Sequence, residues 1–208
     1  VYGDPKYTPI DELHPLHPTS PYAQTKKQVE EIITDVAVSD SEWNAIILRY
    51  FNPVGAHSSG LIGENPKGIP NNLVPYIAKV AEGSLPCLNV YGGDYPTKDG
   101  TGVRDYIHVV DLAMGHLAAV EYLKEEMEKS AIFNLGTGRG ISVLEMIDCY
   151  QDTCGKSIDK QVLGRRPGDV SECFADNTKA RLKLKWIPKL GLKDMCESSW
   201  TFTNKTSE

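Results

Sequence analysis

The chain has no hydrophobic run long enough to cross a membrane. Nowhere among its 208 residues do about 18 consecutive apolar residues occur, the length that a membrane-spanning helix requires. Its first residues also lack the charged segment followed by an apolar stretch that marks a secretory signal. We therefore expect a cytoplasmic protein that does not act at a membrane.

Paired cysteines are missing as well. The five cysteines are odd in number and include no C-x-x-C pair, so the sequence indicates neither a disulfide framework nor a zinc site. We expect free thiols and no bound metal.

Positive charge is not in excess either. With 22 Lys and Arg against 28 Asp and Glu, the formal net charge is −6, and no basic run interleaved with aromatics occurs. This balance argues against a nucleic-acid-binding protein, because phosphate backbones need a positive surface. An anionic ligand would have to be held locally by a few arginines.

A complete phosphate-binding glycine motif is also lacking. Gly136, Gly138 and Gly140 lie between an expected strand and an expected helix, but the third glycine of G-x-G-x-x-G would fall at Ile141. We therefore interpret this loop as a tight structural turn in which Ser142 caps the next helix.

What the chain does contain is an alternation of strand and helix patterns. The nearly continuous apolar run over residues 44–51 predicts a strand buried on both faces in a parallel sheet. Such alternation predicts an α/β fold with a mostly parallel sheet. The further predictions are helices over residues 71–82, 111–129 and 142–154, the last ended by Gly155, and strands over residues 88–91, 103–110 and 131–136.

The first helix begins within the stretch TSPYAQTK. Ser20 is a good N-cap, because its hydroxyl can accept an unpaired backbone N–H, and Pro21 suits the first helical position. Four apolar residues then recur at the helical period and predict that this helix is buried against a core: Val29, Ile32, Ile33 and Val36.

Tyr22 and Lys26 fall one turn apart on one face of this helix, and two interpretations stand. In the first they are an ordinary surface pair, as an isolated Tyr-x-x-x-Lys usually is. In the second, the ammonium group favours the phenolate form of the tyrosine, which could then take a proton from a sugar hydroxyl.

A long loop rich in glycine and proline follows the first expected strand and covers residues 53–70. Its length predicts a binding loop, and ligands of parallel sheets gather at the carboxyl ends of the strands. Asn71 or Asn72 is expected to cap the next helix, whose N-terminus would then face an anion.

Seven motifs together make the chain similar to a known family. In order they are VYGDPKYTPIDE, SPYAQTK, LRYFNPVGAH, GIPNNLVPYIAKVAEG, DGTGVRDYIHVVDLAMGHL, FNLGTG and RRPGDV. They resemble the motifs of UDP-glucose 4-epimerases, also called UDP-galactose 4-epimerases, in the extended short-chain dehydrogenase/reductase superfamily. The resemblance covers essentially the whole chain and thins after about Trp186.

The resemblance implies a truncated Rossmann-type fold, a doubly wound parallel sheet, with a smaller C-terminal α/β domain that binds substrate. Residues 1–52 and about 102–137 would be the remnant of the NAD-binding domain, and residues 53–101 and about 138–208 the nucleotide-sugar-binding domain. The family's opening strand and G-x-x-G-x-x-G loop do not occur in this sequence. We therefore expect the C-terminal portion of an epimerase, with the sheet edge near residues 44–51 uncovered and no complete NAD site.

The implied function is the interconversion of UDP-galactose and UDP-glucose in galactose metabolism, with tightly bound NAD. Tyr22 would take the proton of the sugar 4-OH while the C4 hydride passes to NAD, and Lys26 would hydrogen-bond the nicotinamide ribose. The resulting 4-keto sugar turns in the pocket and takes the hydride back on its other face. Many relatives pair as dimers, so the resemblance also implies a homodimer.

The resemblance assigns the pocket residues too. They are Tyr50, Phe51 and Asn52 at the nicotinamide and sugar, Asn71, Asn72 and Leu73 at the pyrophosphate and sugar, Asn89, Val90 and Tyr91 at the uracil, Arg104 and Arg166 at the phosphates, and Asp169 at the ribose hydroxyls. Two structural alternatives stay open: Arg104 paired with Asp105, and Arg165 rather than Arg166 facing solvent.

Cys173 falls where the family varies between a tyrosine and a small residue beside the C2 substituent of the sugar. A small side chain leaves room for an N-acetyl group. The resemblance therefore also implies interconversion of UDP-GlcNAc and UDP-GalNAc.

Two other functions stay open beside the epimerase. A truncated, non-catalytic UDP-sugar-binding protein would differ from an epimerase in binding no NAD. Another NAD-dependent nucleotide-sugar epimerase, dehydratase or decarboxylase of the same superfamily is the second. Dehydratases typically have an acidic residue beside the base, and Ala23 and Gln24 are not acidic.

Overall fold

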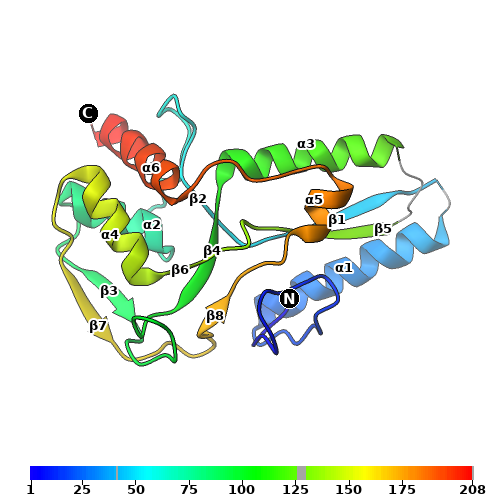
Figure 1. Cartoon of the computed structure of the whole chain (residues 1–208), viewed down its shortest axis with the longest axis horizontal. Helices are drawn as coiled ribbons and strands as arrows, with labels where there is room; N and C mark the ends of the chain where they lie inside the picture. The colour runs from blue at the N-terminus through cyan, green and yellow to red at the C-terminus, as the bar shows by residue number, and fades with distance from the viewer. Residues whose placement is uncertain (41, 126–129, 208) are drawn as a thin grey trace.

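The computed structural model of the chain describes residues 1–40, 42–125 and 130–207. Helices and strands alternate along it, as the sequence predicts (Figure 1). The helices are α1 (Pro21–Ser39), α2 (Leu73–Glu82), α3 (Val109–Glu125), α4 (Val143–Cys154), α5 (Thr178–Lys183) and α6 (Leu192–Ser207). The strands are β1 (Ala45–Tyr50), β2 (Asn52–Val54), β3 (Leu88–Tyr91), β4 (Val103–His108), β5 (Ser130–Leu135), β6 (Gly140–Ser142), β7 (Lys160–Leu163) and β8 (Glu172–Cys173).

The predicted elements all occur, with differences at their ends. Helix α3 begins at Val109, two residues before the predicted start, and the end predicted at residue 129 lies outside the described residues. The short strands β2, β6, β7 and β8 and the helices α5 and α6 have no counterpart in the prediction. Strands β2, β6 and β8 have two or three residues, too few for a period-two pattern to emerge, and all four residues of β7 are exposed, so β7 has no buried face.

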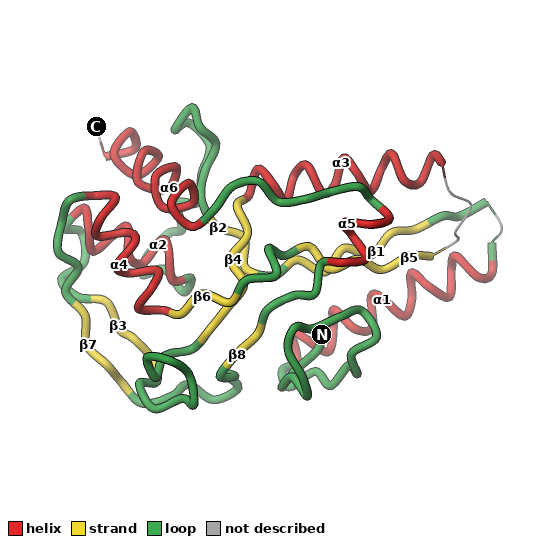
Figure 2. Tube along the Cα trace, in the orientation of Figure 1, coloured by secondary structure: helices red, strands yellow, loops and turns green. Residues whose placement is uncertain are grey.

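The strand pairing is mostly parallel, as predicted. Strand β1 pairs with β5, β2 with β4, β3 with β7 and β8 with β4, all in parallel, whereas β6 pairs with β4 in the antiparallel sense. Figure 2 shows β4 running through the middle of the molecule, between the β1 and β5 pair and the β3 and β7 pair. Strand β4 therefore links the two ends of the elongated molecule.

The prediction that residues 44–51 are buried on both faces is wrong. Only Ile47 and Arg49 of β1 are buried, and Tyr50 is 51% exposed. The reason is that β5 is the only partner of β1 among the described strands, so one edge of β1 is open. Helices α1 and α3 lie on opposite sides of this strand pair and cover its faces only in part (Figure 1). The open edge itself was expected from the sequence.

Helix α1 begins as predicted but is buried less than predicted. The Ser20 hydroxyl accepts a hydrogen bond from the backbone N–H of Ala23 at 3.1 Å, and Pro21 is the first helical residue. The apolar stripe, however, does not bury the helix, since Val29 is 49% and Ile32 is 60% exposed. Ile33 and Val36 are half-buried, and Ala37 is the one fully buried residue of α1. The helix packs on β1 and β5 along one narrow side, so the rest of the stripe faces outward.

Two hydrophobic clusters form the core, one toward each end of the molecule. One cluster joins α2, α4 and α6 to β3, with Ile77, Ile147 and Met195 fully or almost fully buried. The other joins α3 and α5 to β5 around Phe133 and Leu135. Helix α5 and Trp186, which the sequence assigns to the second domain, belong to this second cluster. The two clusters are compatible with two domains, whose boundaries stay a prediction.

The glycine loop after β5 is a structural turn, as interpreted from the sequence. The buried carboxylate of Asp105 accepts hydrogen bonds from the backbone N–H groups of Thr137 (2.8 Å), Gly138 (2.9 Å) and Ala175 (3.1 Å). Burial raises the pKa of Asp105, and these hydrogen bonds oppose that shift. Ser142 then caps α4 in a capping box with Glu145. The loop is thus fastened to β4 by its own backbone N–H groups.

In the described part of the chain, no helix combines the length and apolar character needed to span a membrane. The same residues contain no cluster of three or more His, Cys, Asp or Glu side chains suited to a metal ion. All five cysteines are free thiols.

Candidate active site

Two cavities collect the residues that the sequence singled out. The first, which we name the β3–β4 cavity, has a volume of about 220 Å³ and is bounded by those strands and the start of α2. The second, the α1–β1 cavity, has a volume of about 650 Å³ and is bounded by α1, β1 and the N-terminal segment. Asn52 lines both cavities, so they adjoin at this residue.

The β3–β4 cavity brings together residues that are distant in the sequence. It is lined by the predicted site residues Asn52, Asn71, Asn72, Leu73, Asn89, Val90, Tyr91, Arg104, Arg166 and Asp169. Three tyrosines that the sequence did not single out line it as well, namely Tyr76, Tyr95 and Tyr106. Tyr95 and Tyr106 are buried, and burial raises the pKa of Tyr106 to about 12, so its hydroxyl stays neutral.

The α1–β1 cavity holds the remaining predicted residues. They are Tyr22, Lys26, Tyr50, Phe51 and Cys173, together with the shared Asn52. Tyr22 is 71% exposed, and the Lys26 Nζ lies 5.2 Å from the centre of its ring. The one-turn spacing therefore does place the ammonium group beside the phenol. Both side chains face a cavity, which an ordinary surface pair does not require.

The cationic groups of the β3–β4 cavity gather around one carboxylate. The Arg166 Nε donates a hydrogen bond to Asp169 Oδ2 at 2.9 Å, and the Arg104 Nη2 lies 3.7 Å from Asp169 Oδ1. The structural alternative for Arg104, a pair with Asp105, is not observed, because the carboxylate of Asp105 is bound to Thr137, Gly138 and Ala175. Asp169 thus holds two arginines at the cavity.

The adjacent Arg165 behaves differently. Its Nε donates to Asp94 Oδ1 at 2.8 Å and its Nη2 to the Asp94 carbonyl oxygen at 2.6 Å. Its guanidinium lies 4.3 Å from the centre of the Tyr95 ring. Arg166 lines the β3–β4 cavity and Arg165 does not, which favours Arg166 as the ligand-facing arginine.

The start of α2 lies at the β3–β4 cavity, but the prediction that an asparagine side chain caps this helix is wrong. Asn72 is the N-cap residue by position, yet its side chain makes no capping hydrogen bond. Its Nδ2 instead donates to Glu64 Oε1 at 2.8 Å, because the loop that follows β2 folds back toward the helix start. The first-turn N–H groups of α2 are therefore not capped by this asparagine. An anion at this helix start would meet a favourable dipole.

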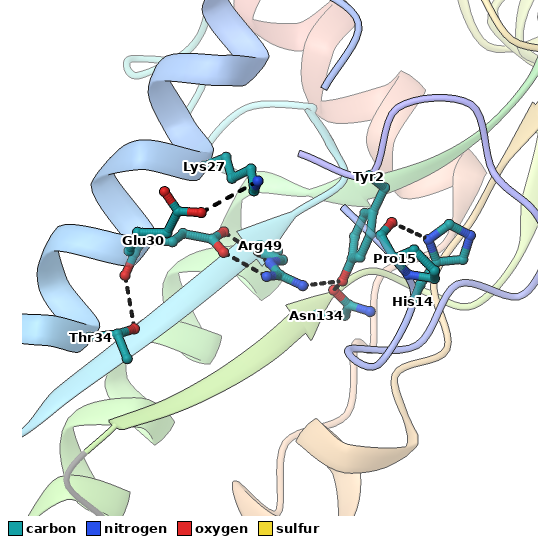
Figure 3. A network of polar contacts seen from close by, with 9 residues as sticks. Tyr2, His14, Pro15, Lys27, Glu30, Thr34, Arg49 and Asn134 are labelled. Atoms are coloured by element: carbon teal, nitrogen blue, oxygen red, sulfur yellow. Dashed lines mark hydrogen bonds and ion pairs between the residues drawn. The ribbon is translucent and has the colours of Figure 1, made fainter. Parts of the chain in front are cut away.

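A buried network that the sequence did not single out includes Tyr2, Glu30 and Arg49, which line one wall of the α1–β1 cavity (Figure 3). Arg49 on β1 donates to both carboxylate oxygens of Glu30 on α1, at 2.9 and 2.6 Å, and to the Tyr2 hydroxyl at 3.0 Å. Tyr2 in turn donates to Asn134 Oδ1 on β5 at 2.5 Å. Arg49 stands inside an apolar strand pattern, and that was the available signal, because a buried charge has to be paired. The network fastens the N-terminal segment, α1, β1 and β5 together.

Comparison with known proteins identifies the family. Residues 1–199 match the family model described as GDP-mannose 4,6 dehydratase. The chain belongs to this family. This member of the GDP-mannose 4,6 dehydratase family is 55% identical over 200 residues to the UDP-glucose 4-epimerase of Bacillus subtilis, which covers 96% of this chain and 59% of that protein.

Solved structures agree with the sequence relatives. The UDP-glucose 4-epimerase from Stenotrophomonas maltophila, with bound NAD and formylated UDP-arabinopyranose, has a TM-score of 0.97 and 45% identity over 100% of this chain and 61% of that one. The enzyme from Bifidobacterium longum, in complex with NAD⁺ and UDP, has a TM-score of 0.95 and 51% identity over 100% of this chain and 62% of that one.

The resemblance inferred from the motifs is therefore confirmed, and so is the Rossmann-type α/β fold. The chain spans 59 to 62% of the length of these three relatives.

Proposed function

We propose that the chain supplies the nucleotide-sugar-binding and proton-transfer part of a UDP-glucose 4-epimerase that interconverts UDP-galactose and UDP-glucose with NAD. The observation that carries the proposal is the meeting of the two cavities at Asn52. One cavity has arginines and an aromatic ring suited to a nucleoside diphosphate, and the other has a phenol beside an ammonium group. A UDP-sugar that lies across both would have its diphosphate in the first and its sugar near the second.

In the β3–β4 cavity, Arg104 and Arg166 would hold the diphosphate. A guanidinium group presents paired N–H donors that match phosphate oxygens, and the N-terminus of α2 adds a favourable dipole. Tyr91 would stack on the uracil, and Asp169 would accept hydrogen bonds from the ribose hydroxyls. The partial burial of Arg104 and Asp169 strengthens both interactions, because it limits competition from water.

The α1–β1 cavity fits the nicotinamide and ribose part of NAD. Tyr22 and Lys26 offer polar groups that suit a ribose, and Tyr50 and Phe51 offer aromatic surface that suits a nicotinamide ring. Among the described residues lining this cavity, no glycine-rich turn is present for the pyrophosphate. When bound, NAD supplies a hydride acceptor for C4 of the sugar.

Tyr22 would accept the proton of the sugar 4-OH, and Lys26 would stabilise the phenolate form that accepts it. Lys26 lies one helical turn from Tyr22, so α1 holds the two groups at a set separation. Asn52, at the junction of the cavities, would contact the sugar. Each of these roles is oriented by a helix or a strand rather than by a loop, which suits precise positioning.

Cys173 would determine which sugars are accepted. It is half-buried on β8 and lines the α1–β1 cavity beside the other sugar-facing residues. Burial raises the pKa of the Cys173 thiol, so the thiol is neutral and acts through its small size rather than as a nucleophile. We therefore propose that UDP-GlcNAc and UDP-GalNAc are also interconverted.

Two alternative functions are each favoured by one observation. The family model that matches is described as a dehydratase, although residues 23 and 24 beside Tyr22 are Ala and Gln, which supply no acid. A non-catalytic UDP-sugar-binding protein is the other, since the described cavity residues offer no glycine-rich turn to NAD.

One experiment separates these functions. The chain is incubated with UDP-galactose and NAD, the formation of UDP-glucose is followed, and the binding of UDP and of NAD is measured separately by calorimetry. Conversion together with UDP binding supports the epimerase. UDP binding without NAD binding or conversion indicates the non-catalytic alternative, and loss of water from the sugar indicates a dehydratase. A chain that binds no UDP would overturn the proposal.

We also propose that the protein is a cytoplasmic homodimer that pairs through α1. The outward apolar side chains of this helix, including Ile32 at 60% and Val38 at 70% exposed, suit a helix-to-helix interface. Sedimentation of the wild type against an Ile32→Glu variant tests the interface, since a charge there should leave a monomer.

A further inference from the structure

A cationic side chain lies over the ring of Tyr91 in this structure. The guanidinium group of Arg166 lies 4.7 Å from the centre of the Tyr91 ring, and both residues line the β3–β4 cavity. Along β3, Leu88 and Val90 are buried while Asn89 and Tyr91 are half-buried. The period of two therefore places Asn89 and Tyr91 on the open side of the strand, and Arg166 occupies aromatic surface on that side.

Asn89, the other side chain on the open side of β3, also has a partner within the chain. Asn89 Oδ1 accepts a hydrogen bond from Gln161 Nε2 on β7 at 2.7 Å. The segment that starts at β7 and continues to Asp169 thus places one partner on each of the two side chains proposed to read the base. Its backbone is tied to β3 by the hydrogen bond from the Gly92 N–H to the Leu163 carbonyl oxygen at 2.9 Å.

Arg166 is held on Tyr91 by weak and exchangeable contacts. Its side chain is 52% exposed, and its ion pair with Asp169 is partly open to water. An exposed ion pair and an exposed cation–π contact each contribute little. Asp169 also keeps Arg104 as a second cationic neighbour, so it would not be left unpaired if Arg166 moved away.

We propose that Arg166 is a displaceable occupant of the Tyr91 ring, so that a nucleotide base and this guanidinium compete for the same aromatic surface. A ligand that carries phosphate gives the displaced arginine a stronger partner than the ring, since charge-assisted bonds to phosphate exceed a cation–π contact at an exposed site. A nucleoside offers no such partner. Arg166 therefore selects nucleoside diphosphates over nucleosides. This inference rests on the proposed function, because it takes the β3–β4 cavity as the nucleotide site.

Arg165 offers a matched control at the neighbouring position. It also stacks on a tyrosine, Tyr95 at 4.3 Å, and also pairs with an aspartate, Asp94. It does not line the β3–β4 cavity. Removal of Arg165 therefore removes a comparable charge and stack without freeing the surface of Tyr91.

The test is calorimetric titration of the full chain with uridine and with UDP. Arg166→Ala should bind uridine about fivefold more tightly than the wild type, because one exposed cation–π contact no longer competes. The same variant should bind UDP at least about tenfold more weakly, because a charge-assisted phosphate contact is lost. Arg165→Ala should leave both affinities within about twofold of the wild type.

The opposite signs for the two ligands distinguish a competing arginine from a plain phosphate ligand. If Arg166→Ala binds uridine with unchanged or weaker affinity than the wild type, the inference is overturned. The proposed function still stands in that case, provided that the wild type binds UDP. Arg166→Lys adds a second readout, because lysine keeps the charge but cannot lie flat on the ring. It should bind uridine more tightly than the wild type and UDP more tightly than Arg166→Ala does. A wild type that binds no UDP overturns the proposed function instead.

Discussion

Arg49 on β1 and Glu30 on α1 form a buried, two-pronged ion pair (Figure 3). The side chains are only 7% and 13% exposed, so the pair is shielded from water. It is the main polar link between a helix that buries little apolar surface and the strand beneath it. Since Tyr22 and Lys26 lie on the same helix, the pair also sets where these two residues stand relative to β1.

Breaking this pair should destabilise the chain strongly. Arg49→Ala leaves the Glu30 carboxylate without its guanidinium partner, which costs about 3–5 kcal/mol for a buried pair. Urea denaturation followed by circular dichroism measures the change. Lys124→Ala serves as the control, because the Lys124–Glu121 pair is exposed on α3 and its loss should cost at most about 1 kcal/mol. Equal effects of the two substitutions would contradict a stabilising role for the buried pair.

Asp105→Asn should also lower the free energy of unfolding of the chain. The carboxylate accepts hydrogen bonds from Thr137, Gly138 and Ala175, and an asparagine turns one acceptor oxygen into an N–H donor that faces other N–H groups. The expected loss is about 2–4 kcal/mol, because a buried donor is left unsatisfied. Thermal denaturation measures it, and Asp176→Asn is the comparison, because the half-buried Asp176 precedes α5 and accepts a hydrogen bond from the backbone N–H of Thr178. A melting temperature of Asp105→Asn within about 2 °C of the wild type would argue against a stabilising role for the hydrogen bonds that Asp105 accepts.

Mild acidification should lower the free energy of unfolding, because His108 is protonated more readily in the unfolded chain than in the folded one. This histidine is buried, its Nδ1 accepts the Val110 N–H at 3.1 Å, and its Nε2 lies 3.0 Å from the Ser198 hydroxyl. Burial lowers the pKa of His108, so the folded state prefers the neutral ring. The unfolded chain therefore binds a proton first, and this contribution to stability is complete above the usual histidine pKa of about 6.5 and is lost below it.

The melting temperature measured from pH 7.5 to 5.5 tests this. We expect a flatter profile in His108→Asn than in the wild type, and an unaltered profile in His57→Asn, whose side chain lies at an exposed position. A His108→Asn profile as steep as that of the wild type would assign the acid sensitivity to other groups.

Tyr22→Phe should remove turnover and keep binding. If Tyr22 is the proton acceptor, conversion of UDP-galactose should fall by about 10²- to 10⁴-fold, which is the usual contribution of a general acid or base. The UDP dissociation constant should stay within about twofold, because Tyr22 does not line the β3–β4 cavity. Turnover comes from a coupled assay and binding from calorimetry. Near-normal turnover in this variant would rule out the assignment.

Cys173→Tyr should narrow the sugar specificity. A bulky ring in the α1–β1 cavity removes the space for an N-acetyl group, so conversion of UDP-GalNAc should fall by roughly tenfold or more while UDP-galactose is still converted. Cys173→Ser is the control, because it keeps the small volume and should retain both activities. Unchanged conversion of UDP-GalNAc in Cys173→Tyr would show that the side chain at this position does not set the specificity.

Local elements were well predicted because their signals are local. The Ser20 cap, the capping of α4 by Ser142 and the end of α4 at Gly155 each depend on residues within one turn of each other. The burial of α1 and β1 was predicted poorly for the opposite reason. Their apolar residues indicate a possible core face, but only the neighbours that pack against them decide whether that face is covered.

The sequence by itself determined the alternation of strands and helices, the order of the motifs and the resemblance to the epimerases, since each depends on residue types at short spacings. The tertiary structure decided which of these residues meet. It alone placed Asn52 at the junction of two cavities, Arg166 on Tyr91, and Arg49 between Glu30 and Tyr2. Such contacts join segments far apart along the chain, so they follow from how helices and strands pack rather than from any local pattern.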